Sequence, residues 1–200
     1  MDHVEPYYLT NFQTVLEDVE NRCGDLLRPE EAARIQDFLA LPAPARRLYV
    51  RMLTRRGPWF RLDDLAYPEV PDLAAALEAL RARGFATAGA AARPEDRVGL
   101  LRRSELEARL GAAGAPWRRS ETRAELQARL LASDPGPGPE LTAPLGLDWV
   151  RLLFLLFFGN GEQMVCDVAP VKGLPVAWTL PLECRGSAPR PSASPRDLTR

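Results

Sequence analysis

The chain has few of the residue types on which most catalytic and metal sites are built. It contains one histidine, His3, and three cysteines, Cys23, Cys166 and Cys184, with no Cys-x-x-Cys spacing. An odd, widely spaced set of cysteines predicts neither a disulfide framework nor a zinc cluster. A single histidine near the N-terminus leaves a serine or cysteine nucleophile without a convincing base. These shortages argue against triad hydrolases and zinc modules.

Long apolar runs are also missing. The longest, Leu152–Phe158, is far shorter than the roughly 20 residues that span a bilayer, and no basic-then-apolar leader opens the chain. We therefore expect a cytoplasmic protein with no membrane partner. The 200 residues are 46% hydrophobic and 26% charged, which is typical of one soluble domain or two small ones.

Lysine is nearly absent, because Lys172 is the only one among 26 basic residues. Arginine supplies the rest, and its distribution is uneven although the net charge is only −1. Residues 1–41 carry nine acids against three arginines, whereas residues 42–62 carry six arginines and no acid. This second stretch is the first candidate for contact with an anionic partner.

The periodicity of residues 7–92 predicts a mainly α module. Apolar residues recur at helical spacing from Tyr7, Pro29-Glu-Glu is a typical helix start, and Pro42 opens a third helix that ends at Gly57-Pro58. An extended segment at 59–62, a helix after Asp72 and a short strand at 85–87 follow. Helix, turn, helix and strand in this order favour a winged-helix-like domain, although many small helical domains share the pattern.

Residues 97–132 predict a small helix–loop–helix. Ser104 stands three residues before Glu107, and Thr122 three before Glu125, which is the spacing of two capping boxes. Trp117, in the loop between the helices, is placed to cover the small core. Linkers are expected at 88–96 and at 134–139. The local excess of arginine makes this unit the second candidate for DNA contact.

The last predicted helix, 148–158, is apolar on nearly all sides. Nothing after it in the sequence looks able to bury it, so we expect an isolated helix that could self-associate through Leu152–Phe158. Residues 161–200 are rich in proline and small polar residues, which predicts a disordered tail.

Four segments carry a resemblance to a known family. Tyr7–Leu16 and Leu41–Leu62, with its run Arg-Arg-Leu-Tyr-Val-Arg-Met-Leu-Thr-Arg-Arg-Gly-Pro, resemble the N-terminal region of the Fanconi-associated nucleases, DNA-repair enzymes with a VRR-NUC catalytic domain. Thr122–Leu130 is similar to the second helix of a SAP motif, and 147–160 resembles the start of the helical-repeat region that follows in the family. The resemblance covers about residues 7–160.

The resemblance implies a DNA-binding N-terminal fragment of a structure-specific, metal-dependent phosphodiesterase acting on branched or flapped DNA, with Mg²⁺ or Mn²⁺ in the complete enzyme. It stops at Gly161, and we expect an out-of-frame or prematurely ended tail. In Pro170-Val-Lys-Gly173, proline stands where the family's catalytic carboxylate is expected. Asp63-Asp64 is more typical of a turn than of a metal site. We therefore predict no catalytic residue, no metal site and no nuclease activity in this chain alone.

The residues predicted to contact DNA phosphates are arginines, whose planar fork fits phosphate oxygens. On the third helix, Arg47 and Arg51 are expected to point away from the apolar face. The alternative interpretation is that the arginines of the third helix form a solvated polar face and that the hairpin at 97–132 serves only for packing. A small winged-helix regulator and a protein-interaction module remain open as other functions. The full predicted set is Arg46, Arg47, Arg51, Arg55, Arg56, Arg118, Arg119 and Arg123.

Overall fold

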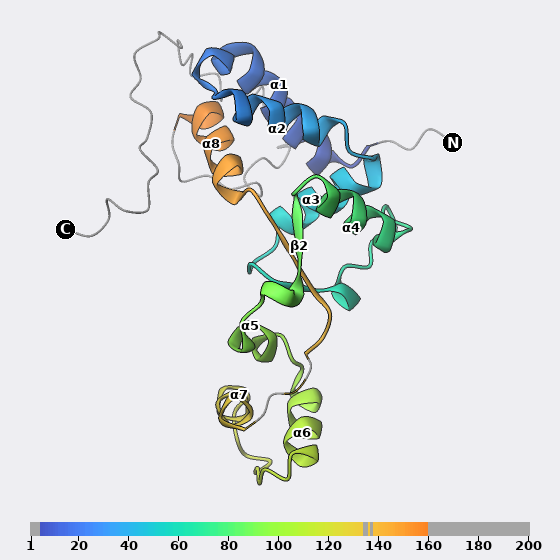
Figure 1. The fold of residues 1–200 in the computed structure, drawn as a ribbon, viewed down its shortest axis with the longest axis vertical. Helices are drawn as coiled ribbons and strands as arrows, with labels where there is room; N and C mark the ends of the chain where they lie inside the picture. Colours follow the sequence, from blue (N-terminus) through green and yellow to red (C-terminus); the bar gives the residue numbers. More distant parts are fainter. Residues whose placement is uncertain (1–4, 134–135, 137, 160–200) are drawn as a thin grey trace, which may run out of the picture.

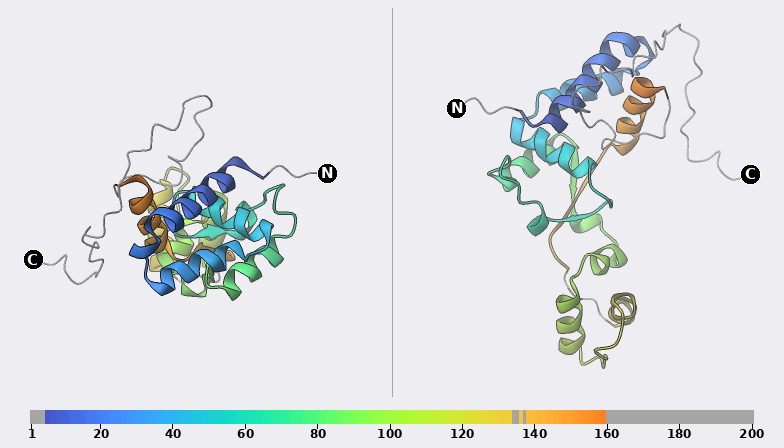
Figure 2. Two further views of the ribbon diagram at one scale, coloured as in Figure 1. Left: turned by 90° about the horizontal axis from the view of Figure 1, so that it is seen from above. Right: turned by 180° about the vertical axis from the view of Figure 1, so that it is seen from behind.

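The computed structural model describes residues 5–133, 136 and 138–159, and it divides them into two parts (Figures 1 and 2). The larger part, which we call the N-terminal body, comprises 5–88 and 141–159. The smaller part, the hairpin lobe, comprises 94–132 and lies at the other end of the long axis. The elements of the body are α1 (Tyr7–Cys23), α2 (Pro29–Leu39), α3 (Ala43–Leu53), α4 (Leu73–Ala82), α8 (Leu147–Phe158), β1 (Phe60–Arg61), β2 (Ala86–Ala88) and β3 (Leu141–Pro144); those of the lobe are α5 (Pro94–Gly99), α6 (Arg103–Ala112) and α7 (Arg123–Ala132).

The first four helices confirm the mainly α, winged-helix-like prediction. Pro29 occupies the first turn of α2, and the Asp72 side chain caps α4 by accepting a hydrogen bond from the Ala75 N–H at 2.9 Å. Gly84 follows α4 with a φ of +67°, a conformation that glycine adopts without strain. The helices enclose one aromatic-rich core, in which Phe38 packs against Tyr49 and Phe85.

The body also contains a three-stranded sheet. Its order is β1-β3-β2, with both neighbours antiparallel to β3; Phe60 pairs with Thr142, and Ala86 with Pro144. The sequence predicted the extended segments around β1 and β2 but not the central strand. All four residues of β3 are buried. The body that begins at residue 5 is therefore completed only by residues far along the chain.

The hairpin lobe has its own small core, formed by Val98, Leu101, Leu106, Leu110, Leu126 and Leu130, with Trp117 packed against it as predicted. Helix α5 lies partly inside the predicted 88–96 linker, which is a correction. The predicted cap at Ser104 is also wrong, because Glu105 accepts the Arg102 backbone N–H at 2.6 Å and α6 begins one residue before Ser104. The box at Thr122 and Glu125 is confirmed.

Helix α8 is not isolated, which corrects the prediction that nothing covers it. It packs beside α1 (Figure 2), with Trp149, Val150, Leu153 and Phe154 buried in the main core. The Trp149 indole N–H donates to the Glu31 carbonyl at 3.2 Å, and its ring meets Phe12 edge-on. The cover comes from helices that precede α8 in the sequence, so its apolar character gives no support to self-association.

No helix in the described part of the chain is long and apolar enough to cross a membrane. The predicted disordered tail at 161–200, together with Cys166, Cys184 and the Pro170–Gly173 motif, lies outside the described residues, as does His3.

Candidate nucleic-acid interface

Helices α2 and α3 are joined by Ala40, Leu41 and Pro42, a short turn of helix-turn-helix type. Arg47, which the sequence predicts as a DNA-phosphate contact, is held within the fold. The Arg47 side chain is only 12% exposed and donates to both carboxylate oxygens of Glu5, at 3.1 and 3.0 Å. A third hydrogen bond, of 3.3 Å, reaches the Glu69 carbonyl. Arg47 therefore ties α3 to the segment before α1.

Arg51 is held in the same way. Its Nε and one terminal NH group donate to Glu69 Oε1 at 3.0 and 2.8 Å, and the Tyr8 hydroxyl donates to the same oxygen at 2.9 Å. The guanidinium carbon lies 4.4 Å from the centre of the Tyr8 ring. Burial, followed by the hydrogen bond to Glu69, raises the pKa of Tyr8 to about 12, so its hydroxyl stays a donor near neutral pH.

The other predicted arginines of this group differ in exposure. Arg46 is half-buried, and its Nε has no hydrogen-bond partner among the described residues. Arg55 is exposed but donates to the Asp64 carbonyl at 2.9 Å and to the Tyr67 hydroxyl at 3.0 Å. Arg56 is exposed, and no described residue hydrogen-bonds to its side chain. Arg55 and Arg56 are thus exposed outside any carboxylate pair, whereas Arg51, whose side chain is 38% exposed, is paired with Glu69.

The predicted arginines of the hairpin lobe are arranged differently. Arg118, Arg119 and Arg123 are exposed, and none forms an ion pair with any residue that the structure describes. Arg118 and Arg119 lie in the loop before α7, and Arg123 is its first residue. Arg123 donates to the carbonyls of Gly99 and Leu101 at 2.8 and 3.0 Å, which holds it near the start of the helix without neutralising it. The lobe therefore presents uncompensated positive charge.

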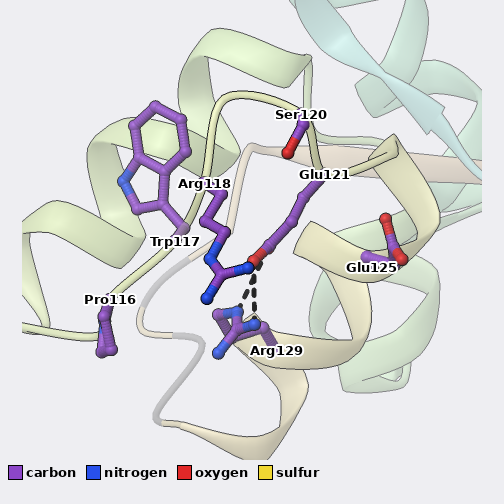
Figure 3. A pocket seen from close by; sticks show the side chains of 7 residues that line it. All are labelled: Pro116, Trp117, Arg118, Ser120, Glu121, Glu125 and Arg129. Atoms are coloured by element: carbon purple, nitrogen blue, oxygen red, sulfur yellow. Dashed lines mark hydrogen bonds and ion pairs between the residues drawn. The ribbon is translucent and has the colours of Figure 1, made fainter.

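A cleft of about 460 Å³ opens beside these arginines, and Figure 3 shows its lining. Trp117 and Arg118 project from the loop, and Glu121 points toward Arg129, which donates to it at 3.2 and 2.9 Å. Arg129 was not predicted as a site residue, although its position four residues after Glu125 could have indicated a shared helix face. The lining residues are Pro116, Trp117, Arg118, Ser120, Glu121, Glu125 and Arg129.

This arrangement is suited to binding a polyanion. The exposed arginines surround the N-terminal end of α7, where backbone N–H groups and the helix dipole add to the positive potential. Residues 97–132 contain eight arginines and four acids, and 8 − 4 gives a charge of +4. Glu125 is occupied by the cap, since it accepts the Thr122 N–H at 2.6 Å.

The carboxylates of the described residues do not fit a catalytic metal site. Asp63 pairs with Arg61 at 3.3 Å, and Asp64 pairs with Arg102 at 2.9 Å. Within residues 5–133, 136 and 138–159, no three histidine, cysteine or acidic residues lie close enough to hold a metal ion. We derive no chemical step through a metal here.

Part of the chain is similar to a known protein family. Residues 6–87 match the family model described as "FAN1, HTH domain". The chain is 42% identical over 78 residues to the Fanconi-associated nuclease 1 homolog of Arabidopsis thaliana, covering 39% of this chain and 9% of that protein. It is 41% identical over 100 residues to the homolog of Pseudomonas aeruginosa, covering 50% of this chain and 18% of the relative.

Among solved structures, the chain is similar to paFAN1 bound to 5′ flap DNA with a gap. The TM-score is 0.71 at 30% identity, over 80% of this chain and 31% of that one. Residues 6–87 are 82 of the 200 residues, about two-fifths, so the structural likeness extends well beyond the matched domain. The chain spans less than a third of this neighbour and under a fifth of the two relatives.

Proposed function

We propose that this chain, whose residues 6–87 match the family model described as "FAN1, HTH domain", is a DNA-holding part of a structure-specific repair nuclease. The observation that carries the proposal is the exposed group Arg118, Arg119 and Arg123 at the start of α7, none of which forms an ion pair with a described residue. The structural neighbour's binding of 5′ flap DNA supports branched or flapped DNA as the ligand.

We further propose that the hairpin lobe acts as a SAP-like module. Two short helices joined by a loop, with arginines at the start of the second, can grip the DNA backbone through phosphate contacts and a helix N-terminus. Such contacts position a protein on DNA without reading its sequence. In this proposal Arg55 and Arg56 of the body add to the contact, while Arg47 and Arg51 serve mainly to hold the body together.

Cleavage is assigned in this proposal to the complete family enzyme. Its VRR-NUC domain, with Mg²⁺ or Mn²⁺, would supply phosphodiesterase chemistry that the described residues here do not offer. We expect the purified chain with Mg²⁺ or Mn²⁺ to leave a 5′ flap substrate intact on a denaturing gel. Metal-dependent cutting that persists through repeated purification would contradict this part of the proposal.

The DNA-binding proposal is tested by fluorescence anisotropy on a labelled 5′ flap and a matched duplex at several salt concentrations. Each phosphate contact contributes about 0.9 to the slope of log affinity against log salt on duplex DNA. Replacing Arg118, Arg119 and Arg123 together by alanine removes up to three contacts, so the slope should fall by up to about 2.7.

The matched control replaces three exposed arginines that already pair with nearby acids, Arg28, Arg93 and Arg151. It changes the net charge of the chain by the same amount, so an effect of net charge alone would appear in both triple variants. The proposal fails if the two triple variants lose affinity equally. A strong preference for one duplex sequence over the flap would instead favour a winged-helix regulator.

A further inference from the structure

The junction between the N-terminal body and the hairpin lobe contains a charged contact in which the arginine is buried and the carboxylate is 33% exposed. Arg61, in strand β1 of the body, is only 5% exposed and faces Glu105 in the first turn of α6. The guanidinium donates to both carboxylate oxygens of Glu105, at 2.6 and 2.8 Å. The same guanidinium donates to the Leu100 carbonyl at 3.3 Å. An arginine of one part is thus bound at several points to the other.

Glu105 is itself held firmly. As the capping residue of α6 it accepts the Arg102 backbone N–H at 2.6 Å, so its carboxylate is fixed relative to the helix axis. On the other side, Asp63 accepts a hydrogen bond of 3.3 Å from Arg61 and steadies the guanidinium. The contact therefore joins a strand of the body to a helix end of the lobe through a guanidinium and a carboxylate that each have a further hydrogen-bond partner.

Stability alone does not account for an ion pair whose arginine is buried in this way. Removing two charges from water carries a desolvation cost that the attraction between them often only offsets, and apolar residues of similar volume stabilise at least as well. The Arg61 Nε is also buried without a hydrogen-bond partner among the described residues. What a two-point arginine–carboxylate contact does supply is a single allowed geometry, because its two parallel hydrogen bonds fix direction as well as distance.

We propose that the Arg61–Glu105 pair is a clamp that fixes the angle between the N-terminal body and the hairpin lobe, so that both parts contact one DNA molecule. The second half of this inference rests on the proposed function. Arg61 and Glu105 are positioning residues, because neither is available to touch DNA while they bind each other. The clamp holds Arg118, Arg119 and Arg123 of the lobe in a constant relation to Arg55 and Arg56 of the body.

Other contacts at the junction are less able to do this. Arg102 pairs with Asp64 at 2.9 Å, but the two side chains are 62% and 41% exposed, and exposed pairs contribute little. Arg55 also donates a hydrogen bond to the Asp64 carbonyl, which brings this arginine of the body close to the start of α6. Two binding surfaces held in register act at a high effective concentration, which falls when their connection loosens.

The test compares Glu105→Gln with Glu125→Gln in the full chain. Glutamine can still accept the capping N–H, so both variants keep their helix start and lose one charge. Glu125 occupies the same capping position in α7 but does not contact the body. Nitrogen-15 relaxation should give one rotational correlation time for the amides of α1, α3, α6 and α7 in the wild type and in Glu125→Gln. In Glu105→Gln the amides of α6 and α7 should tumble faster than those of α1 and α3.

A second variant, Arg61→Lys, keeps the positive charge and removes the two-point geometry, and we expect the same separate tumbling. The clamp is overturned if both parts still tumble as one unit in Glu105→Gln and Arg61→Lys. Affinity for a 5′ flap should fall about tenfold in these two variants relative to the wild type. Separate tumbling with unchanged affinity would overturn the shared contact with DNA. If even the wild type fails to bind DNA, the proposed function fails, while the relaxation data still decide the clamp.

Discussion

The N-terminal body and the hairpin lobe use the same residue for opposite purposes. Arg47 and Arg51 of the body each bind a carboxylate, of Glu5 and Glu69 respectively. Arg118 and Arg119 of the lobe bind no described carboxylate and stand in solvent. An arginine-rich stretch without local acids therefore does not identify a DNA-binding surface. Whether a distant carboxylate reaches each guanidinium in the fold is what separates a structural arginine from a binding one.

The first way to sharpen this comparison is to ask whether the two parts fold separately. Leu106 is fully buried in the small core of the lobe, and replacing it by alanine should cost about 2–5 kcal/mol there. We expect Leu106→Ala to unfold the lobe while α1 to α4 persist, as measured by hydrogen exchange resolved by residue. Loss of protection across the body as well would mean that the two cores are one cooperative unit.

The second experiment separates the two arginine groups. Replacing Arg47 and Arg51 together by alanine leaves Glu69 half-buried without its ion pair, so the free energy of unfolding should fall by about 1–3 kcal/mol. The salt dependence of DNA binding should barely change. Arg118→Ala with Arg119→Ala should do the reverse. The measurements are urea unfolding and fluorescence anisotropy on both double variants. A lower salt slope in the Arg47 and Arg51 double variant would show that α3 contacts DNA.

Much of the body could be predicted from local signals. Pro29 with its two following acids, Asp72 as a cap and Gly84 as a stop all act within one turn of the helix they delimit, so a short window of sequence contains them. Strand β3 has no such local signal. It is a strand because Thr142 lies opposite Phe60 on one side and Ala88 on the other, and those partners are far away in the sequence.

The candidate site likewise has one part that local sequence signals predict and another that they do not. The start of α7 was predictable, because Thr122 and Glu125 satisfy each other's backbone groups, and so was the exposure of the arginines around it. The pairing of Arg47 with Glu5 and of Arg61 with Glu105 was not, since these partners are separated by 42 and 44 residues. No spacing rule joins such residues; only the packing of the whole chain does.

A smaller effect tests the two predicted caps against each other. Thr122→Ala removes a real cap of α7 and should destabilise the lobe by about 1 kcal/mol. Ser104→Ala should have almost no effect, because Ser104 lies inside α6 rather than at its N-cap. Thermal unfolding of the two variants provides the measurement. Equal losses would restore the cap at Ser104 that the sequence suggested.

The smallest expected effect is a change in stability at low pH. The hydrogen bonds from Arg61 lower the pKa of Glu105 to about 2 from an ordinary value of 4.5. A carboxyl whose pKa is lower in the folded state stabilises the fold above the ordinary value and loses that contribution as pH falls toward the lowered one. We expect the stability difference between wild type and Glu105→Gln to shrink between pH 4.5 and about 2. A difference that is constant with pH would show that the pair contributes no charge interaction.

The order of elements along the chain has a consequence for biosynthesis. The central strand β3 and helix α8 close the body, yet they are translated after the whole hairpin lobe. The lobe is built from contacts between residues near in sequence, so it can form as soon as it leaves the ribosome. Phe12 of the body, by contrast, can pack against Trp149 only after Trp149 has been synthesised. Until residue 154 has emerged, the nascent body exposes one side of α1 and an open sheet. We expect the nascent body to be most prone to aggregation during that interval of synthesis.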